Sequence, residues 1–318
     1  MGRIRTFALL LFAWGAATMA MAQDSQTAYN FLRLPMSAHA AALGGDNISL
    51  IEDDAALMFN NPALLGSVSD KTIGLNFMTY MQGAVVAGAS FNRTVGERAS
   101  WGATAQYADY GKMKETDLNN TQLGEFTAKD IAVAGLFSYE LTDKLVGGIA
   151  AKIITSYIGK YNSLTVGIDL GLNYYNPDQD LSLSIAARNL GGQLNAYHDD
   201  YERMPMDLQI GATKRLKGAP FRLSASLVDM THYDYKFINH LAVGVDILLS
   251  PTIWIGGGYN FRRAKEMTLR NGDDEESSHG AGLSLGAGLQ LERFKLNLAY
   301  AKYHVSSNSI VINLALNI

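Results

Sequence analysis

The sequence contains no cysteine, so no disulfide framework holds the fold together and its stability has to come from another source. After residue 22 it also contains no run of 18 consecutive apolar residues, which excludes membrane-spanning helices. Basic residues are fewer than acidic ones, 26 against 30, and this balance argues against a nucleic-acid partner.

The motifs of common enzyme classes are absent as well. Residues 23–318 contain no G-x-S-x-G elbow, no phosphate-binding G-x-x-x-x-G-K-[ST] loop and no S-x-x-K motif. The six histidines are scattered, and none has the H-E-x-x-H spacing of a zinc enzyme. The acidic run Asp273–Glu276 lacks the ligand spacing of a calcium loop, so we interpret it as a solvated loop. We therefore expect no enzyme activity, no catalytic residues, no cofactor and no metal site.

The first 22 residues have the pattern of a secretory signal peptide. Arg3 and Arg5 form a basic start, an apolar run follows from Phe7 to Met21, and Ala20-Met21-Ala22 offers an A-x-A cleavage site. The apolar run is shorter than the roughly 20 residues that a spanning helix needs. We therefore expect residues 1–22 to be removed.

From residue 71 to the end, a hydrophobic alternation with a period of two restarts again and again. In the last segment, Ile310, Ile312 and Leu314 fall on one face, and Val311 and Asn313 fall on the other. The segments have about the length of a tilted membrane-spanning strand, roughly 9–11 residues. The predicted strands are Lys71–Tyr80, Ala84–Asn92, Ala99–Tyr110, Phe126–Tyr139, Lys144–Thr155, Leu164–Tyr175, Asp180–Leu190, Asp207–Leu216, Phe221–Met230, Phe237–Leu249, Thr252–Arg262, His279–Leu291, Phe294–Tyr303 and Asn308–Ile318.

This pattern predicts an all-β protein, a 14-stranded antiparallel transmembrane β-barrel over residues 71–318. Only a closed barrel lets strands cross hydrocarbon without unpaired backbone groups at an edge. Asp169 and Asp246 in mid-strand are costly toward lipid, so their faces should line the lumen. Those faces are also rich in small residues, which suggests that another segment fills part of the lumen. The competing fold is a soluble β-sandwich, but it gives no reason for the links between strands to alternate between short and long.

The link lengths also predict the orientation. Links after even-numbered strands are short, whereas long polar links follow several odd-numbered ones, at Gly111–Glu125, Gly191–Met206 and Arg263–Ser278. Outer-membrane barrels place short turns in the periplasm and long loops outside. We expect a multi-pass barrel in the outer membrane of a Gram-negative bacterium, with the N- and C-termini periplasmic.

Residues 23–70 have no strand pattern and are too apolar for a free tail. Ser37 is placed to cap a short helix that ends at Gly44-Gly45, and Asn61-Pro62 is a favourable helix start. We expect this hatch-like segment to pack into or beneath the barrel. Gly44, Gly45, Asn61, Pro62 and Ala63 form its motif, which either fixes the geometry of the segment or lines a ligand path.

This N-terminal segment resembles the start of the PorQ family, barrels of the Bacteroidetes type IX secretion system. The matching motifs are Ala-Ala-Leu-Gly-Gly at 41–45, Glu-Asp-Asp at 52–54 and Asn-Pro-Ala at 61–63, all within residues 30–77. More distantly the pattern is similar to PorV and to the FadL-type fatty-acid channels, which are fourteen-stranded barrels with an N-terminal hatch. One departure is the C-terminal Ile318, where many outer-membrane barrels end in an aromatic residue.

The resemblance implies a role in protein export. PorQ-like proteins hold PorZ at the cell surface and, through it, join the PorU/PorV attachment complex, which links secreted cargo to a surface lipopolysaccharide. The long outer loops would then bind the surface partner, with Tyr197, Tyr201, Tyr233 and Tyr235 as contact residues, because exposed tyrosines often anchor interfaces. The alternatives are a FadL-like channel for hydrophobic small molecules and, less compatible with a hatch, an open diffusion porin.

Overall fold

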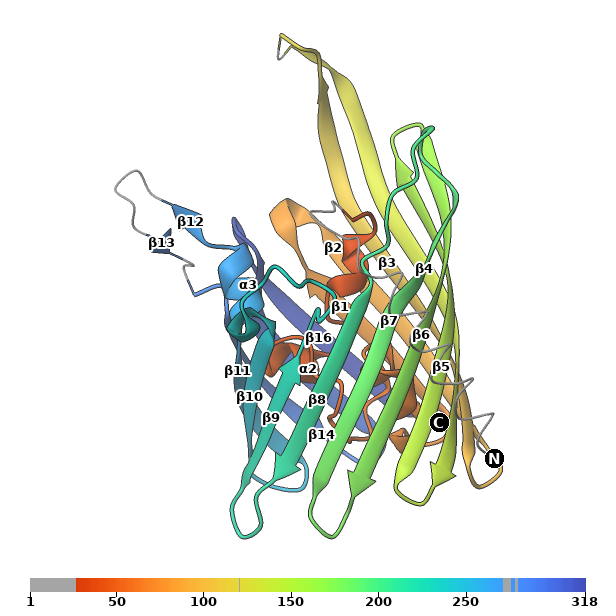
Figure 1. The fold of residues 1–318 in the computed structure, drawn as a ribbon, viewed down its shortest axis with the longest axis vertical. Helices are drawn as coiled ribbons and strands as arrows, with labels where there is room; N and C mark the ends of the chain where they lie inside the picture. Colours follow the sequence, from red (N-terminus) through yellow and green to blue (C-terminus); the bar gives the residue numbers. More distant parts are fainter. Residues whose placement is uncertain (1–26, 120, 271–275, 278–279) are drawn as a thin grey trace.

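The computed structural model describes residues 27–119, 121–270, 276–277 and 280–318, and its architecture is a closed antiparallel β-barrel of 14 strands (Figure 1). Each strand pairs with its neighbours in the chain, and β1 pairs with β16 to close the barrel, for example through Phe77 and Ile312. The predicted signal peptide lies outside the described residues. Among the described residues, no helix is long and apolar enough to cross a membrane.

The barrel strands are β1 (Thr72–Thr79), β2 (Val85–Val95), β3 (Ala99–Thr116), β4 (Gln122–Thr142), β5 (Leu145–Ile158), β6 (Tyr161–Asn176), β7 (Leu181–Asn195), β8 (Asp207–Arg215), β9 (Phe221–Leu227), β10 (Leu241–Leu248), β11 (Ile253–Asn260), β14 (Leu283–Gln290), β15 (Phe294–His304) and β16 (Ser307–Asn317). A two-residue ladder, β12 (Leu269–Arg270) with β13 (Glu276–Ser277), lies in the link between β11 and β14. The helical elements are η1 (Asn30–Arg33), α2 (Ala38–Ala42), η2 (Ala55–Phe59), η3 (Pro62–Ser67), η4 (Met81–Gly83), η5 (Phe237–His240) and α3 (Phe261–Glu266).

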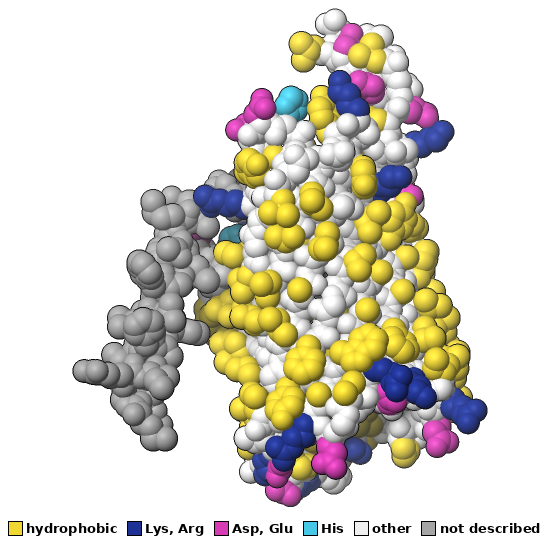
Figure 2. Space-filling model, turned by 90° about the vertical axis from the view of Figure 1, so that its right-hand side faces the viewer, with side chains coloured by type: hydrophobic (Ala, Val, Ile, Leu, Met, Phe, Trp, Pro, Cys, Tyr) yellow, Lys and Arg dark blue, Asp and Glu magenta, His cyan; other side chains and the backbone are white. Residues whose placement is uncertain are grey.

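The outer wall is apolar and the lumen face is small or polar, as the alternation predicts. Along β6 the exposed side chains are Leu164, Val166, Ile168, Leu170, Leu172 and Tyr174, whereas Ser163, Thr165, Asp169 and Asn173 are buried. Asp246 is buried too. Figure 2 shows hydrophobic side chains over the middle of the wall, with most of the charged side chains above and below. Such a belt is what a barrel presents to acyl chains, and the fold is that of an outer-membrane barrel.

The two ends of the barrel differ. At one end the strands are joined by short turns, and we call it the short-turn end. At the other, the long-loop end, lie the links after β3, β7, β9 and β11 (Figure 1). The barrel itself starts and finishes at the short-turn end, where the Ile318 N–H donates to the Lys71 carbonyl. The first described residue, Thr27, lies at the long-loop end, where it forms a bridge with Arg203 in the link between β7 and β8. The expected position of the processed N-terminus itself lies outside the described residues.

Several predicted boundaries are wrong at the long-loop end. The predicted polar link Gly111–Glu125 is mostly a strand hairpin, because β3 and β4 continue past the apolar belt, where a strand no longer needs an apolar face. The predicted strand Thr252–Arg262 ends at Asn260, whose side chain accepts a hydrogen bond from the Arg263 N–H and so starts α3. The predicted strand Phe237–Leu249 begins with the helical turn η5, and β9 ends at Leu227 rather than at Met230.

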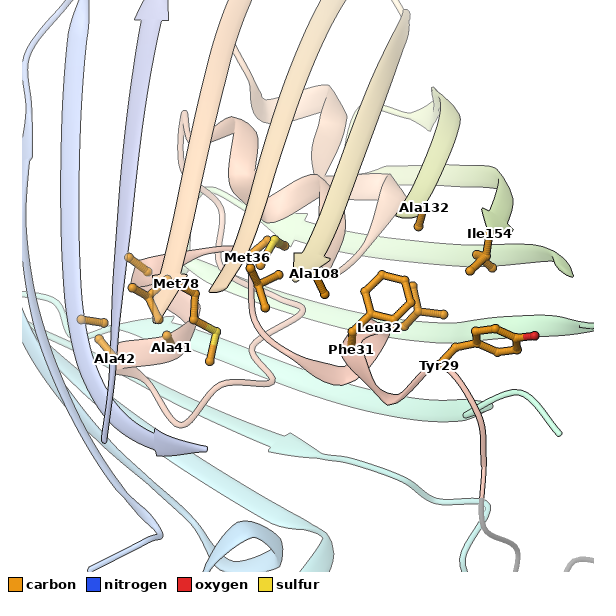
Figure 3. Packing of buried hydrophobic residues seen from close by; sticks show 14 of the residues in the cluster. Tyr29, Phe31, Leu32, Met36, Ala41, Ala42, Met78, Ala108, Ala132 and Ile154 are labelled. Carbon is orange, nitrogen blue, oxygen red and sulfur yellow. The ribbon is translucent and has the colours of Figure 1, made fainter. Parts of the chain in front are cut away.

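Residues 27–70 occupy the lumen, and we call them the hatch. They descend from the long-loop end and join β1 at the short-turn end. Figure 3 shows Phe31, Leu32 and Met36 of the hatch among wall residues such as Ala108 and Ala132. The hatch thus forms the hydrophobic core that an empty barrel lacks.

Candidate functional site

The triplet Asn61, Pro62 and Ala63 starts η3 where the hatch meets the wall at β5 and β6. The Asn61 side chain accepts a hydrogen bond from the Ala63 N–H (3.0 Å) and donates one to the Ile48 carbonyl (3.0 Å), so it caps the helix and joins two parts of the hatch. A Cβ atom on Gly148 of β5 would overlap the main chain of Pro62 and Ala63. The wall therefore carries glycine where this motif comes closest to it.

The Gly44-Gly45 pair follows α2, whose N-terminal Ser37 side chain accepts a hydrogen bond from the Ala40 N–H as expected. Both glycines have φ above +100°, a region that side chains disfavour. The Gly44 carbonyl accepts hydrogen bonds from Asn260 Nδ2 (2.9 Å) and Arg263 Nη1 (3.4 Å). These contacts fasten the hatch to the end of β11 and to α3.

A buried charged cluster joins the hatch to β9 and β10. His39 of α2 is fully buried, with Nδ1 2.7 Å from Glu52 Oε2 and Nε2 3.0 Å from Asp246 Oδ1. Arg222 contacts both carboxylates, at 2.7 Å from Glu52 and 2.8 Å from Asp246. The His39 ring also stacks on Trp254 of β11. Two cations and two anions are thereby paired in a largely buried site, where His39 and Asp246 are buried and Arg222 and Glu52 keep 11% exposure.

The charges of this cluster determine the protonation of its hatch members. Burial alone would lower the pKa of His39, but Glu52 and Asp246 outweigh it and raise that pKa to about 9. Burial would raise the pKa of Glu52, but Arg222 and His39 hold it well below its usual range. At neutral pH the His39 imidazolium and the Glu52 carboxylate are therefore both charged. The cluster holds the hatch to β9 and β10 by ion pairs and does not act as a proton-transfer site.

At the long-loop end the hatch, α3 and the link after β9 line an open cavity of about 510 Å³. Most of its lining is charged or polar, and includes Arg33, Asp46, Asp207, Asp234, Arg262, Arg263 and Glu266 beside the aromatic residues Tyr80, Tyr235 and Tyr303. Arg262 lies 3.0 Å from Asp229 and 2.8 Å from Glu266, so much of this charge is already paired. Burial opposes the charged form of Asp229, but Arg262 and Arg33 hold its pKa below the usual value.

Deeper in the lumen, between the hatch and strands β3–β7, a second cavity holds only about 30 Å³. That volume admits roughly two water molecules. Leu32, Met36 and Phe59 of the hatch line it together with Lys152 and Asp169, which form a buried ion pair at 2.7 Å. The lumen is thus narrow and partly charged below the outer cavity.

The structure separates the four tyrosines of the long loops into two pairs. Tyr201 and Tyr233 are exposed, at 67% and 75%. Tyr197 packs against Tyr29 of the hatch with ring centroids 6.3 Å apart, and Tyr235 stacks on His232. The first pair is thus exposed, and the second pair is half-buried with an aromatic neighbour.

Neither the His39 cluster nor the cavity at the long-loop end is among the features predicted from the sequence. A signal for the cluster was present, because Glu52 opens the acidic run 52–54 between two apolar stretches and Asp246 falls on a lumen face. Among the described residues, no group of histidine and carboxylate side chains has an arrangement that holds a metal ion. The acidic run that starts at Asp273 lies mostly outside the described residues.

The sequence matches no protein-family model and no curated protein. Solved structures do share the fold. The deltaS2S3 mutant of the monoaromatic hydrocarbon channel TodX has a TM-score of 0.60 at 13% identity, over 89% of this chain and 99% of that one. The toluene transporter TodX of Pseudomonas putida gives a TM-score of 0.56 at 14% identity, covering 89% and 97%. The hydrocarbon channel CymD gives 0.59 at 14% identity, covering 91% and 98%. These neighbours are channels, not enzymes, and the chain is similar to them in its whole fold: a 14-stranded outer-membrane β-barrel.

Proposed function

We propose that this chain is a non-enzymatic outer-membrane component of the type IX secretion system, which holds a PorZ-like protein at the cell surface through its long loops. The observation that carries the proposal is the lumen, which the hatch fills and fastens by buried charges. A barrel whose lumen is filled in this way presents its long loops as the surface that an outer partner can reach. The PorQ-like motifs at 41–45, 52–54 and 61–63 support the same role.

The proposal includes an orientation. The short-turn end, with Lys71 and Ile318, faces the periplasm, and the long-loop end faces outward. The exposed residues Tyr201 and Tyr233 and the β3–β4 hairpin then lie outside the cell, where a surface protein and, through it, a PorU/PorV complex can reach them.

A second candidate function is a channel for hydrophobic small molecules. The comparisons support it more directly than they support the secretion role, because the neighbours of the same fold are hydrocarbon channels. The cavity of about 510 Å³ also has the size of a ligand pocket. Its lining counts against this function, since pockets for apolar ligands are lined mainly by apolar side chains, and here Arg33, Arg262 and Glu266 lie on it.

One deletion and one transport assay separate the two functions. Replacing residues 112–126 by two glycines removes the β3–β4 hairpin and leaves the belt intact. Under the secretion role, a PorZ-like partner leaves the cell surface, as measured by surface labelling of intact cells. The matched control makes the same replacement at the short turn Lys217–Pro220, at the opposite end of the barrel, and should leave the partner on the cell surface. If the partner remains after the hairpin deletion, while the chain speeds the entry of toluene into cells, the second function is correct.

A further inference from the structure

The β3–β4 hairpin extends beyond the rest of the barrel, and its outer part has open edges (Figure 1). β4 pairs with β3 as far as Gln122, opposite Thr116, but β5 reaches β4 only at Ala128, opposite Ile158. Within the described residues, Gln122–Phe126 therefore have a strand partner on one side only. An exposed edge presents unpaired N–H and C=O groups, with which a further strand can pair.

The main-chain groups at this edge point outward. The Thr127 carbonyl accepts a hydrogen bond from the Gly159 N–H, so Thr127 directs its main-chain groups toward β5. Alternate residues of a strand direct these groups to the same side, and Glu125 therefore presents its N–H and C=O at the open edge. Lys114 is directly opposite Glu125 and presents its own groups at the other edge of the hairpin, the one that faces away from β5.

Beside this β4 edge lies a cleft of about 720 Å³, bounded by the hairpin and the β5–β6 turn. Its apolar side is formed by Phe126, Ile158 and Tyr161. All three share the lumen-side face with Ala128, because Phe126 is two residues before Ala128, Ile158 is opposite Ala128, and Tyr161 is opposite Ile158. Its polar side carries Lys112 and Glu125, an ion pair at 3.3 Å. A strand placed here would meet apolar side chains on one face and charges on the other.

We propose that the open edge of β4 binds an extended segment of a partner protein by strand addition. The segment alternates apolar side chains, which contact Phe126, Ile158 and Tyr161, with polar ones, which contact Lys112 and Glu125. Main-chain hydrogen bonds supply the affinity, and the two faces of the cleft supply the specificity. The inference rests on the proposed function, since it names the loop and the binding mode by which the barrel would hold its surface partner.

The occupant follows from the chemistry of the edge. Acyl chains cannot satisfy the main-chain groups of Glu125, whereas an extended peptide does. Antiparallel pairing of two copies along β4 would invert one barrel relative to the other, and two barrels inserted in the same direction in one membrane do not permit that; parallel pairing of two copies is an outcome that the test below detects. A different protein with a free extended segment meets neither obstacle.

The test uses the full chain in detergent micelles and two fluorescein-labelled peptides. One alternates valine and threonine over seven residues with lysine at both ends, and the other has proline at its centre. Fluorescence anisotropy should show binding of the first peptide and at least tenfold weaker binding of the second. Glu125→Pro should weaken binding of the first peptide at least tenfold, because it removes the edge N–H, and a proline whose N–H position faces solvent is tolerated in an edge strand. Lys114→Pro changes the same hairpin at the opposite edge and should leave binding unchanged.

Equal binding of the two peptides, or equal loss in both proline variants, overturns the inference. So does a dimer in analytical ultracentrifugation that Glu125→Pro dissolves, because the occupant would then be a second copy. The proposed function fails separately, if removal of the hairpin leaves the PorZ-like partner on the surface. If the hairpin deletion releases the partner but Glu125→Pro does not weaken binding of the first peptide, the proposed function stands and strand addition is wrong.

Discussion

The imidazole of His39 lies flat on the indole of Trp254, with ring centroids 3.5 Å apart and an angle of 3° between the planes. His39 belongs to the hatch and Trp254 to β11, so this stack joins the lumen segment directly to the barrel wall. A protonated imidazole is attracted to an aromatic face, and Glu52 and Asp246 keep it protonated. One residue thus brings aromatic and ionic contacts together at the fastening of the hatch.

The first prediction is a loss of stability at alkaline pH. The pKa of His39 is raised in the folded protein from 6.5 to about 9, so its contribution is fully present below pH 6.5 and is lost as the pH rises through 9. A shift of this size corresponds to about 3 kcal/mol. Thermal unfolding in micelles between pH 6 and pH 10 should show the loss, and His39→Gln should lower the melting temperature at pH 7 and flatten the profile. The same change at the exposed His198 is the control, and a His39→Gln profile parallel to the wild type would contradict the prediction.

The second prediction concerns the close approach of hatch and wall at β5. Gly148→Ala should displace η3, because its Cβ would overlap the main chain of Ala63. We expect a destabilisation of about 2 kcal/mol or more and faster cleavage of the hatch by a protease added to micelles. Gly135→Ala on β4 places a Cβ where no atom lies within 4 Å and should change neither. Equal protease resistance of the two variants would show that the hatch does not need this contact.

The third prediction separates the two roles of Asn61. Asn61→Ala removes the cap of η3 and leaves the Ile48 carbonyl without its donor, a combined loss of about 2–4 kcal/mol. Asn61→Ser keeps a side-chain acceptor for the cap and loses the amide donor without burying a charge, so we expect an intermediate stability. Denaturant unfolding of the folded barrel should rank wild type, Ser and Ala in that order. A cost for Ser as large as that for Ala would show that the cap contributes nothing.

The sequence predicts the wall better than it predicts the interior. Strand alternation is local, so the outward Leu170 and the inward Asp169 can be assigned from neighbouring residues alone. The Asn61 cap is local too. His39, Glu52 and Asp246 are brought together only by the closure of the barrel around the hatch, and no spacing in the chain encodes their meeting. The strand predicted through Phe261 failed for a different reason: the alternation continues past Asn260, but the side chain of Asn260 caps a helix there.

The fourth prediction concerns the tyrosines of the long loops, which the structure divides by exposure. Tyr233→Ala should weaken the hold on a PorZ-like partner by about 2 kcal/mol, roughly 30-fold in affinity, if Tyr233 anchors the interface, and should leave the melting temperature unchanged because the side chain is 75% exposed. Tyr197→Ala should lower the melting temperature and leave the affinity for the partner unchanged. Tyr197 packs on Tyr29 of the hatch, so its loss removes a contact of the folded state. Binding of purified partner to the barrel in nanodiscs, measured beside thermal unfolding, gives both quantities. Partner binding that depends on Tyr197 and not on Tyr233 would move the interface from the exposed loops to the rim of the hatch.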